Sequence, residues 1–137
     1  MSDCLFCKII NKEIPSSLVY EDEKIVAFLD IKPVNPGHTL VVPKKHSTQL
    51  LDADDETVRE LFSATRKIAQ AVVLATGAVG FNVEVNCGPV AGQIIQHLHL
   101  HIVPRREDDG LRHWPGHEYP AQAAEEMAQK IRRTLNG

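Results

Sequence analysis

The sequence predicts an α+β fold with a mainly antiparallel five-stranded sheet and two main helices. A chain of 137 residues is long enough for one domain that buries a core without disulfides. Short β-prone runs, separated by turn residues, recur within residues 19–43 and 81–103. Two longer segments carry apolar residues at helical spacing. We therefore expect a single domain over residues 1–137, with its core in 1–104 and a C-terminal loop and helix in 105–137.

The first two strands are expected to form a hairpin near the N-terminus. Residues 19–20 and 25–29 are β-prone, and the turn-like segment 21–24 separates them. We expect Asp30 to end the second strand. Upstream of the hairpin, residues 5–10 are compatible with a short helix, although they also fit extended chain.

The third strand is expected just after a turn. Asn35-Pro36-Gly37 is a turn signal, and residues 38–42 predict a buried strand. Pro43 closes this strand, because proline has no backbone N–H to donate to a neighbouring strand. His38 then lies at the entrance of the strand.

Two helices are predicted in the remaining chain. Asp52 or Asp54 caps the first, and Gly77 ends it. Its apolar residues recur at roughly helical spacing: Val58, Leu61, Phe62, Ile68, Val72 and Val73. The second helix follows Pro120, with acidic residues near its start and arginines near its end, as the helix dipole favours. Its apolar stripe consists of Met127, Ile131 and Leu135. We expect this last helix to dock on the domain and to stabilise it.

The last two strands alternate polar and apolar residues. In residues 81–86, Asn86 belongs to the polar face. In residues 97–103, the same alternation places three histidines on one face and apolar residues on the other. These histidines are His97, His99 and His101. Pro104 is expected to end the strand.

Composition and charge exclude several classes of protein. The formal net charge is -3, and no dense block of Lys and Arg occurs, so nucleic acid is not an expected partner. The N-terminus lacks the basic and apolar segments of a secretory signal, and no apolar run is long enough to span a membrane. We therefore expect a cytoplasmic protein without a membrane partner. Its 3 cysteines indicate reduced thiols or metal ligands rather than disulfides.

The row of histidines is the strongest candidate site. Side chains at alternate positions of a strand project from one face about 6.6 Å apart. Three imidazoles fill a core poorly, because each needs hydration or a hydrogen-bond partner, so we favour a functional row over chance. The alternatives are a solvent-exposed strand face and a three-histidine zinc centre. The Gly- and Pro-rich loop at residues 86–93 is expected to expose backbone N–H groups near the row, and such donors suit an anion.

Several segments, in order, resemble the histidine triad (HIT) family of nucleotide hydrolases and transferases. Ala91-Gly92-Gln93, followed by His-Leu-His-Leu-His-Ile-Val-Pro at residues 97–104, looks like the family signature. The other similar segments are Cys4-Leu5-Phe6-Cys7-Lys8-Ile9-Ile10, Ile14-Pro15, Ala27-Phe28-Leu29-Asp30, Pro36-Gly37-His38-Thr39-Leu40-Val41-Val42-Pro43-Lys44 and His46. The resemblance covers essentially the whole chain and is least diagnostic near the C-terminus.

The resemblance implies that His99 is a nucleophile that attacks the α-phosphorus and holds a nucleotidyl-imidazole intermediate until water resolves it. Imidazole chemistry agrees, because a ring with a pKa of about 6.5 is mostly neutral at pH 7, nucleophilic and a competent leaving group. To present Nε2, the ring must hold its Nδ1–H against an acceptor, commonly a backbone carbonyl. His38 and His101 resemble the accessory catalytic histidines, which contact phosphate oxygens and take part in proton transfer.

The resemblance also implies how a nucleotide is held. Asp30 matches the residue that accepts hydrogen bonds from both ribose hydroxyls. Asn86 matches a polar contact to phosphate or sugar, and Gly92 and Gln93 match the turn whose backbone approaches the phosphate. His99 and His101 complete this nucleotide-binding set. Ile94 departs from the family, which often has Ser or Thr there, so a hydroxyl contact to the phosphate or leaving group is lost.

A second constellation indicates zinc. Cys4 and Cys7 form a two-thiolate pair that zinc favours. The N-terminus resembles zinc-containing bacterial members related to the Hint branch, and in these the histidine after Pro-Lys-Lys and the first histidine of the triad complete the set. Here these are His46 and His97, and four protein ligands imply a structural zinc. The alternatives are a redox pair and two unrelated buried thiols, but no strand precedes Cys4 as in thioredoxin-like motifs.

The sequence therefore predicts a nucleotidyl hydrolase that cleaves the α-phosphate bond of a purine nucleotide conjugate, with adenosine favoured and no organic cofactor. The leaving group, from a phosphoramidate or a dinucleoside polyphosphate, stays open. The alternatives are a non-catalytic nucleotide-binding regulatory protein, favoured if Ile94 blunts the chemistry, and a zinc-handling protein. The resemblance also implies a homodimer in which the sheets of two protomers join. Trp114 could line a base or leaving-group pocket, but we expect a packing role.

Overall fold

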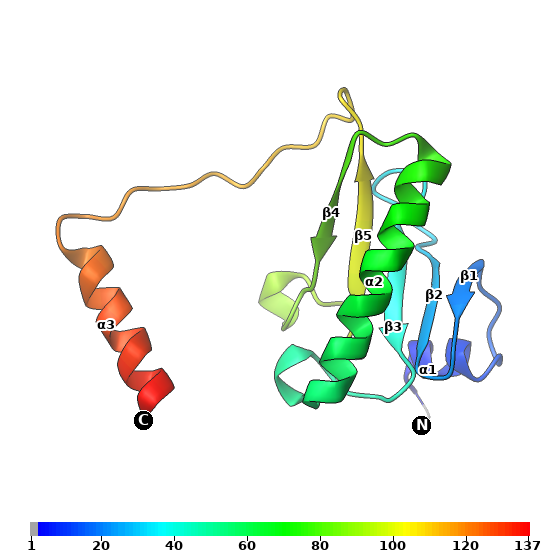
Figure 1. Ribbon diagram of the computed structural model, residues 1–137, viewed down its shortest axis with the longest axis horizontal. Helices are drawn as coiled ribbons and strands as arrows, with labels where there is room; N and C mark the ends of the chain where they lie inside the picture. Colours follow the sequence, from blue (N-terminus) through cyan, green and yellow to red (C-terminus); the bar gives the residue numbers. More distant parts are fainter. Residues whose placement is uncertain (1–2) are drawn as a thin grey trace.

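The computed structural model describes residues 3–137 and has the predicted α+β architecture (Figure 1). Its strands are β1 (Leu18–Glu21), β2 (Ile25–Leu29), β3 (Thr39–Pro43), β4 (Gly80–Glu84) and β5 (Leu100–Arg105). They form one antiparallel sheet in the order β1-β2-β3-β5-β4. The α-helices are α1 (Leu5–Ile10), α2 (Asp55–Thr76) and α3 (Ala123–Asn136). Short 3-10 helices occupy Leu50–Asp52 and Pro89–Ala91. The five-stranded sheet and the two main helices are confirmed.

The β1–β2 hairpin forms where the turn residues predict it. Asp22 closes the turn, because its Oδ1 accepts the backbone N–H groups of Lys24 at 2.7 Å and Ile25 at 2.8 Å. The aspartate side chain thus replaces a backbone acceptor within the turn. Asp30 directly follows β2, as expected.

The third strand is shifted by one residue from the prediction. It begins at Thr39 and includes Pro43 instead of ending before it. The backbone N–H of His38 donates to the carbonyl of Asn35 at 3.0 Å, which closes the turn before the strand. His38 therefore lies at the entrance of β3, as predicted, with a buried side chain.

The helix α2 covers one face of the sheet (Figure 1). Asp54 caps it, since its Oδ1 accepts the backbone N–H of Thr57 at 2.7 Å, and Gly77 ends it at φ 71°, a conformation that costs glycine little. The core on this face consists of Leu61, Ala64, Ile68, Ala69 and Val72 from α2 with Ile25, Ala27, Val41, Leu98, Leu100 and Ile102. The apolar residues of the histidine segment thus point toward α2. No helix in residues 3–137 has the length and apolar character needed to cross a membrane.

The short helix α1 packs against a second cluster of the core. Its residues Phe6 and Ile9 are buried against Val26, Phe28, Leu40 and Val42. A helix of 6 residues is too short to be stable alone, so this packing holds it in place. Cys4 caps the helix by accepting the backbone N–H of Cys7 at 3.3 Å. The packing thereby fixes the position of both cysteines.

The strand β5 differs from the prediction at both ends. A strand was expected over residues 97–103, but β5 begins after His99 and continues through Pro104. Pairing between β3 and β5 stops at Ile102, so Pro104, which has no N–H to donate, lies beyond the last β3 pair. Its carbonyl accepts the side-chain amide of Asn35 at 2.8 Å. The prediction that Pro104 ends the strand is therefore wrong.

The C-terminal segment contradicts the expectation that the last helix docks on its own domain. After β5 the chain has no helix or strand until α3, which lies apart from the sheet (Figure 1). The helix has no buried residue, and Met127, Ile131 and Leu135 are 44%, 54% and 79% exposed. An amphipathic helix normally buries such a stripe. These side chains contribute no buried apolar surface within this chain.

Candidate active site

His99 presents one bare ring nitrogen to the candidate site. Its side chain is buried, and its Nδ1 lies 2.7 Å from the backbone carbonyl oxygen of His97. Because a carbonyl only accepts hydrogen bonds, Nδ1 carries the ring hydrogen and Nε2 keeps its lone pair. The ring of Phe6 packs edge-on against His99, with centroids 4.9 Å apart. Burial lowers the pKa of His99, which keeps the ring neutral and Nε2 available as a nucleophile.

His38 and His101 form a hydrogen-bonded pair next to His99. The backbone N–H of Val34 donates to Nδ1 of His38 at 3.0 Å, so the ring hydrogen of His38 is on Nε2. This Nε2 lies 2.9 Å from Nδ1 of His101 and donates to it. His101 therefore carries its own hydrogen on Nε2. The rings of His99 and His101 are 4.9 Å apart, so the structure brings the three predicted catalytic histidines together.

An apolar cavity of about 260 Å³ opens beside these histidines. Asp30, His99 and His101 lie on its wall. The other residues that line it are Leu5, Phe6, Ile9, Pro15, Ser16, Phe28, Leu29, Ile31, Leu40, Gly92, Ile94 and Ile95. Oδ1 of Asp30 accepts the backbone N–H of Lys32 at 2.8 Å, and Oδ2 lies 3.6 Å from Nε2 of His38. The cavity therefore offers apolar walls to a ring system and a carboxylate to hydroxyl groups.

The loop before the histidine segment is held by the side chain of Gln93. This side chain is buried; its Oε1 accepts the backbone N–H of Gly88 at 2.8 Å, and its Nε2 donates to two backbone carbonyls, including that of Thr48 at 2.7 Å. Both ends of the amide are engaged, so Gln93 positions the loop and does not offer its amide to a ligand. Gly92 has φ 99°, and a Cβ there would lie 3.5 Å from Nδ2 of Asn86.

A second, more polar hollow also reaches the His38–His101 pair. It is lined by Val34, His38, Asn82, Val83, Glu84, Val85, Asn86, His101, Val103, Arg105, Leu111, Arg112, His113 and Trp114. Asn86 lies here and does not line the apolar cavity. Trp114 is 90% exposed, so the expectation that it packs within its own domain is wrong. The histidine pair thus borders an apolar space and a polar one.

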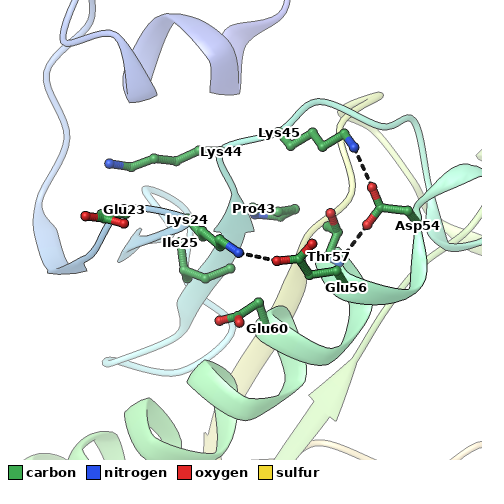
Figure 2. A pocket seen from close by; sticks show the side chains of 10 residues that line it. All are labelled: Glu23, Lys24, Ile25, Pro43, Lys44, Lys45, Asp54, Glu56, Thr57 and Glu60. Carbon is green, nitrogen blue, oxygen red and sulfur yellow. Dashed lines mark hydrogen bonds and ion pairs between the residues drawn. The ribbon is translucent and has the colours of Figure 1, made fainter.

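A third hollow, at the start of α2, contains none of the predicted site residues (Figure 2). Its lining residues are Glu23, Lys24, Ile25, Pro43, Lys44, Lys45, Asp54, Glu56, Thr57 and Glu60. Figure 2 shows that Lys24 pairs with Glu56 and that Lys45 pairs with Asp54. Such exposed ion pairs contribute little to stability. Because Lys24, Lys45, Asp54 and Glu56 already pair with one another and none of the predicted site residues lies here, we place no function in this hollow.

The four predicted zinc ligands come together at one end of the histidine segment. Nδ1 of His97 lies 3.3 Å from Sγ of Cys4, 3.6 Å from Sγ of Cys7 and 3.1 Å from Nδ1 of His46. Tetrahedral zinc, with bonds of about 2.3 Å to sulfur and about 2.0–2.1 Å to nitrogen, would space S and N ligands about 3.5 Å apart and two N ligands about 3.3 Å apart. Nε2 of His97 donates to the carbonyl of Pro43 at 2.8 Å, which leaves Nδ1 bare. Spacing and tautomer both fit zinc.

Backbone groups fix the ring nitrogens, and sequence reasoning did not identify them. The contact of His99 with the carbonyl of His97 could have been predicted from the sequence, because an extended segment places residues i and i-2 on the same side. The carbonyl of Pro43 had no such signal, since Pro43 lies far from His97 in the sequence. The N–H of Val34 comes from the turn just before His38, and residue types do not show that it faces the ring. The packing of Phe6 on His99 was likewise not predicted.

Comparison with known proteins identifies relatives over most of the chain. Residues 11–108 match the HIT domain. The chain is 35% identical over 136 residues to adenosine 5'-monophosphoramidase HNT1 of Saccharomyces cerevisiae. The aligned region covers 98% of this chain and 84% of that protein. It is 44% identical over 110 residues to adenylylsulfatase HINT3 of Arabidopsis thaliana, which covers 80% of this chain and 56% of that protein.

Solved structures share the fold. SMU.412c from Streptococcus mutans has a TM-score of 0.94 and 42% identity, covering 98% of this chain and 87% of that one. A Zn-bound histidine triad family protein from Mycobacterium smegmatis has a TM-score of 0.77 and 37% identity, covering 98% of this chain and 94% of that one. The similarity therefore extends over nearly the whole length of each chain.

Proposed function

Because the chain belongs to the HIT domain family, we propose that it is a nucleotidyl hydrolase that cleaves the α-phosphate bond of a purine nucleotide conjugate. The names of two relatives, an adenosine 5'-monophosphoramidase and an adenylylsulfatase, support adenosine as the nucleoside. The observation that carries the proposal is the bare Nε2 of His99 at the wall of an apolar cavity. A neutral imidazole in that position is a nucleophile that needs no separate base.

The reaction proceeds in two steps in this proposal. Nε2 of His99 attacks the α-phosphorus, the new P–N bond forms, and the bond to the leaving group breaks with its electron pair on the leaving group. The carbonyl of His97 holds Nδ1–H while the ring gains positive charge. Water then attacks the phosphorus, the P–N electron pair returns to the ring, and the proton of water passes to solvent. His99 begins and ends the cycle neutral.

The neighbouring residues orient the nucleotide. We assign the base to the apolar cavity and the ribose to Asp30, whose carboxylate accepts from hydroxyl groups. The backbone at Gly92 and Gln93 and the side chain of Asn86 would lie near the phosphate. The His38–His101 pair would donate a hydrogen bond to a phosphate oxygen.

The direct test is a search for a covalent nucleotide. The wild-type protein is mixed with an adenosine phosphoramidate, quenched without acid and measured by intact-mass spectrometry. We expect a species heavier by one adenylyl group that appears and decays during turnover. Nucleotide binding without this species would support a non-catalytic nucleotide-binding protein instead.

Replacing Asp30 with alanine is expected to weaken the binding of nucleotides more than the binding of their 2',3'-dideoxy analogues, because only nucleotides offer ribose hydroxyl donors. Loss of a charged hydrogen-bond partner should cost about 1.5–3 kcal/mol of binding free energy in a desolvated site. Calorimetric titration of both ligands measures the difference. Asp30→Asn keeps an acceptor for Lys32 and serves as the control for local structure. If the substitution weakens the binding of both ligands equally, Asp30 has a structural role.

We also propose that Cys4, Cys7, His46 and His97 hold a structural zinc. The spacing of their donor atoms and the bare Nδ1 of His97 support this assignment, and a Zn-bound relative agrees with it. The four protein ligands leave no position for substrate, so the zinc takes no part in the reaction. Its contribution is to tie the N-terminus and the chain after β3 to the histidine segment.

We further propose that the chain forms a homodimer and that α3 contributes to the interface. The edges of the sheet are β1 and β4, and an open edge can pair with a second copy. The exposed stripe of Met127, Ile131 and Leu135 finds no partner within residues 3–137. A second copy of this chain would give the stripe a surface to bury.

Ile131→Glu is expected to weaken the dimer, because a charge would replace a buried apolar side chain. Burial of such a side chain stabilises by about 1.5–3 kcal/mol, so the dimer dissociation constant should rise at least about tenfold. Gln129→Glu adds the same charge on the opposite side of α3 and serves as the matched control. Sedimentation experiments measure the dimer dissociation constant of each variant. Equal dissociation constants for the two variants would place the interface elsewhere.

A further inference from the structure

The short helix α1 lies between the zinc cluster and the apolar cavity. Cys4, which caps the helix, and Cys7 within it belong to the four-residue zinc cluster. Leu5, Phe6 and Ile9 of the same helix line the apolar cavity. Because a helix has 3.6 residues per turn, these two sets of side chains project from opposite sides of it. The helix is therefore a wall that the two sites share.

The ring of Phe6 contacts residues of both sites. It is buried, and its centroid lies 4.9 Å from that of His99 and 6.0 Å from that of His97, edge-on in both cases. It also packs edge-on against Phe28, another residue of the cavity wall, at 5.4 Å. Aromatic rings attract one another in this geometry. A displacement of Phe6 would therefore change the cavity wall and the packing of His99 together.

Within residues 3–137, the polar contacts that join α1 to distant parts of the chain are those of its two cysteines. Sγ of Cys4 lies 3.3 Å from Nδ1 of His97, and Sγ of Cys7 lies 3.5 Å from Nδ1 of His46. The other hydrogen bonds of residues 4–10 are local to the helix and to the turn after it. A helix of 6 residues does not hold its conformation alone. The position of α1 thus depends on the zinc cluster and on the apolar packing beside the cavity.

The parts of the site assigned to ribose and phosphate are held by other elements. Asp30 follows β2 and accepts the backbone N–H of Lys32. The loop at Gln93 is held by hydrogen bonds from its side chain to backbone groups of Gly88 and Thr48. None of these three hydrogen bonds involves α1. A change in α1 should therefore affect the base more than the ribose or the phosphate.

We propose that α1 couples the two sites, so that a purine base in the cavity strengthens metal binding by Cys4 and Cys7. Thermodynamic linkage then requires that the metal-bound cysteines strengthen binding of the base by the same factor. Leu5 and Phe6 are the positioning residues that carry the effect. The first ligand to bind meets the entropic cost of ordering α1, and the second does not. This inference rests on the proposed function and on the proposed zinc site.

Coupling through α1 differs from a general effect of zinc on the fold. If loss of zinc simply unfolded the chain, every ligand of the folded protein would strengthen zinc binding alike at equal saturation. A ligand at ten times its dissociation constant that binds only the zinc-loaded state strengthens zinc binding about elevenfold, and one that binds both states equally has no effect. Coupling through α1 therefore depends on whether the ligand carries a base.

A competition experiment on the full chain measures this dependence without reference to activity. A chelator of known affinity competes for zinc in the presence of adenosine 5'-monophosphate or ribose 5-phosphate, and it is calibrated with the same ligand in the absence of protein. Each ligand is supplied at ten times its calorimetric dissociation constant for the zinc-loaded protein. We expect the nucleotide to strengthen zinc binding about 5–11-fold, and ribose 5-phosphate to strengthen it less than about twofold. Equal factors for the two ligands, or no effect of the nucleotide, would overturn the proposal.

Substitutions in α1 test whether this helix carries the effect. Leu5→Ala removes an exposed side chain from the cavity wall and leaves the zinc ligands and the buried Phe6 in place. At ten times the dissociation constant of the variant, the effect of the nucleotide on zinc affinity should fall toward that of ribose 5-phosphate. Lys8→Ala is the matched control, because it truncates a side chain of the same helix that does not line the cavity. It should keep the wild-type factor. A wild-type factor in Leu5→Ala, or an equal loss in both variants, would overturn the role of α1.

Failure of the proposed function gives a different result. If no covalent nucleotide forms on His99 but the nucleotide still strengthens zinc binding, the hydrolase proposal is lost and the coupling stands. If the covalent nucleotide forms and zinc affinity does not respond to the nucleotide, only the coupling is lost. The two conclusions are therefore tested separately.

Discussion

His99→Asn is expected to abolish the covalent nucleotide and to lower turnover by about three orders of magnitude or more. The amide nitrogen of asparagine has no free lone pair with which to attack phosphorus. Its N–H groups remain donors, so the variant can still satisfy the carbonyl of His97 that holds the wild-type ring. Fold and nucleotide binding should therefore persist while the covalent step is lost.

The matched control is His117→Asn, the same substitution at an exposed histidine of the C-terminal segment that lines none of the three hollows described above. Intact-mass spectrometry after an acid-free quench follows the adduct, because phosphoimidazoles hydrolyse in acid. If His99→Asn accumulated the adduct, or turned over substrate near the wild-type rate, the assignment of the nucleophile would be wrong.

Zinc content distinguishes the nucleophile from a metal ligand. The proposed zinc cluster has four ligands without His99, although His97 and His99 are neighbours on the same segment. His99→Asn should therefore retain its zinc. Loss of zinc from this variant would return support to a three-histidine metal centre.

The elements that could be predicted from sequence are those that depend on local signals. Asp54 and Gly77 mark the ends of α2, because capping and left-handed conformations have strong residue preferences. The alternation around His99 correctly separated the histidines from the apolar residues that pack toward α2. The family resemblance, and not the spacing of residues, identified His46 and His97 as the ligands that complete the set with the two cysteines.

Features that depend on tertiary context were not predictable in the same way. Proline usually ends a strand, but Pro104 continues β5 because its carbonyl meets Asn35 and no β3 pair lies opposite. The apolar stripe of α3 predicted docking, but the stripe is a property of the helix and does not specify which chain supplies the partner surface. The tautomers of the histidines depend on peptide groups such as the N–H of Val34, and side-chain sequence does not show which peptide group approaches a ring.

Cys4→Ser is expected to remove zinc and to lower the free energy of unfolding by more than about 4 kcal/mol, the range in which loss of a metal site falls. The substitution isolates the metal, because serine is a preferred helix cap and can replace Sγ as acceptor for the N–H of Cys7. Without zinc, the buried His97 keeps its contact to Pro43 but loses the metal that would hold its other ring nitrogen in place. Since the carbonyl of His97 orients His99, turnover should fall together with stability.

Cys87→Ser is the matched control, because it makes the same chemical change at a cysteine outside the zinc cluster. Elemental analysis of protein purified without chelators should give one zinc per chain for the wild type and for Cys87→Ser, and none for Cys4→Ser. Denaturant unfolding measures the difference in stability between the two variants. A wild-type protein without stoichiometric zinc would refute the site, and a Cys4→Ser variant that lost zinc but unfolded like Cys87→Ser would show that the metal does not stabilise the fold. The helix cap at α1 is retained in Cys4→Ser. A large loss of stability in that variant alone can therefore be attributed to loss of the zinc that ties the N-terminus to the histidine segment.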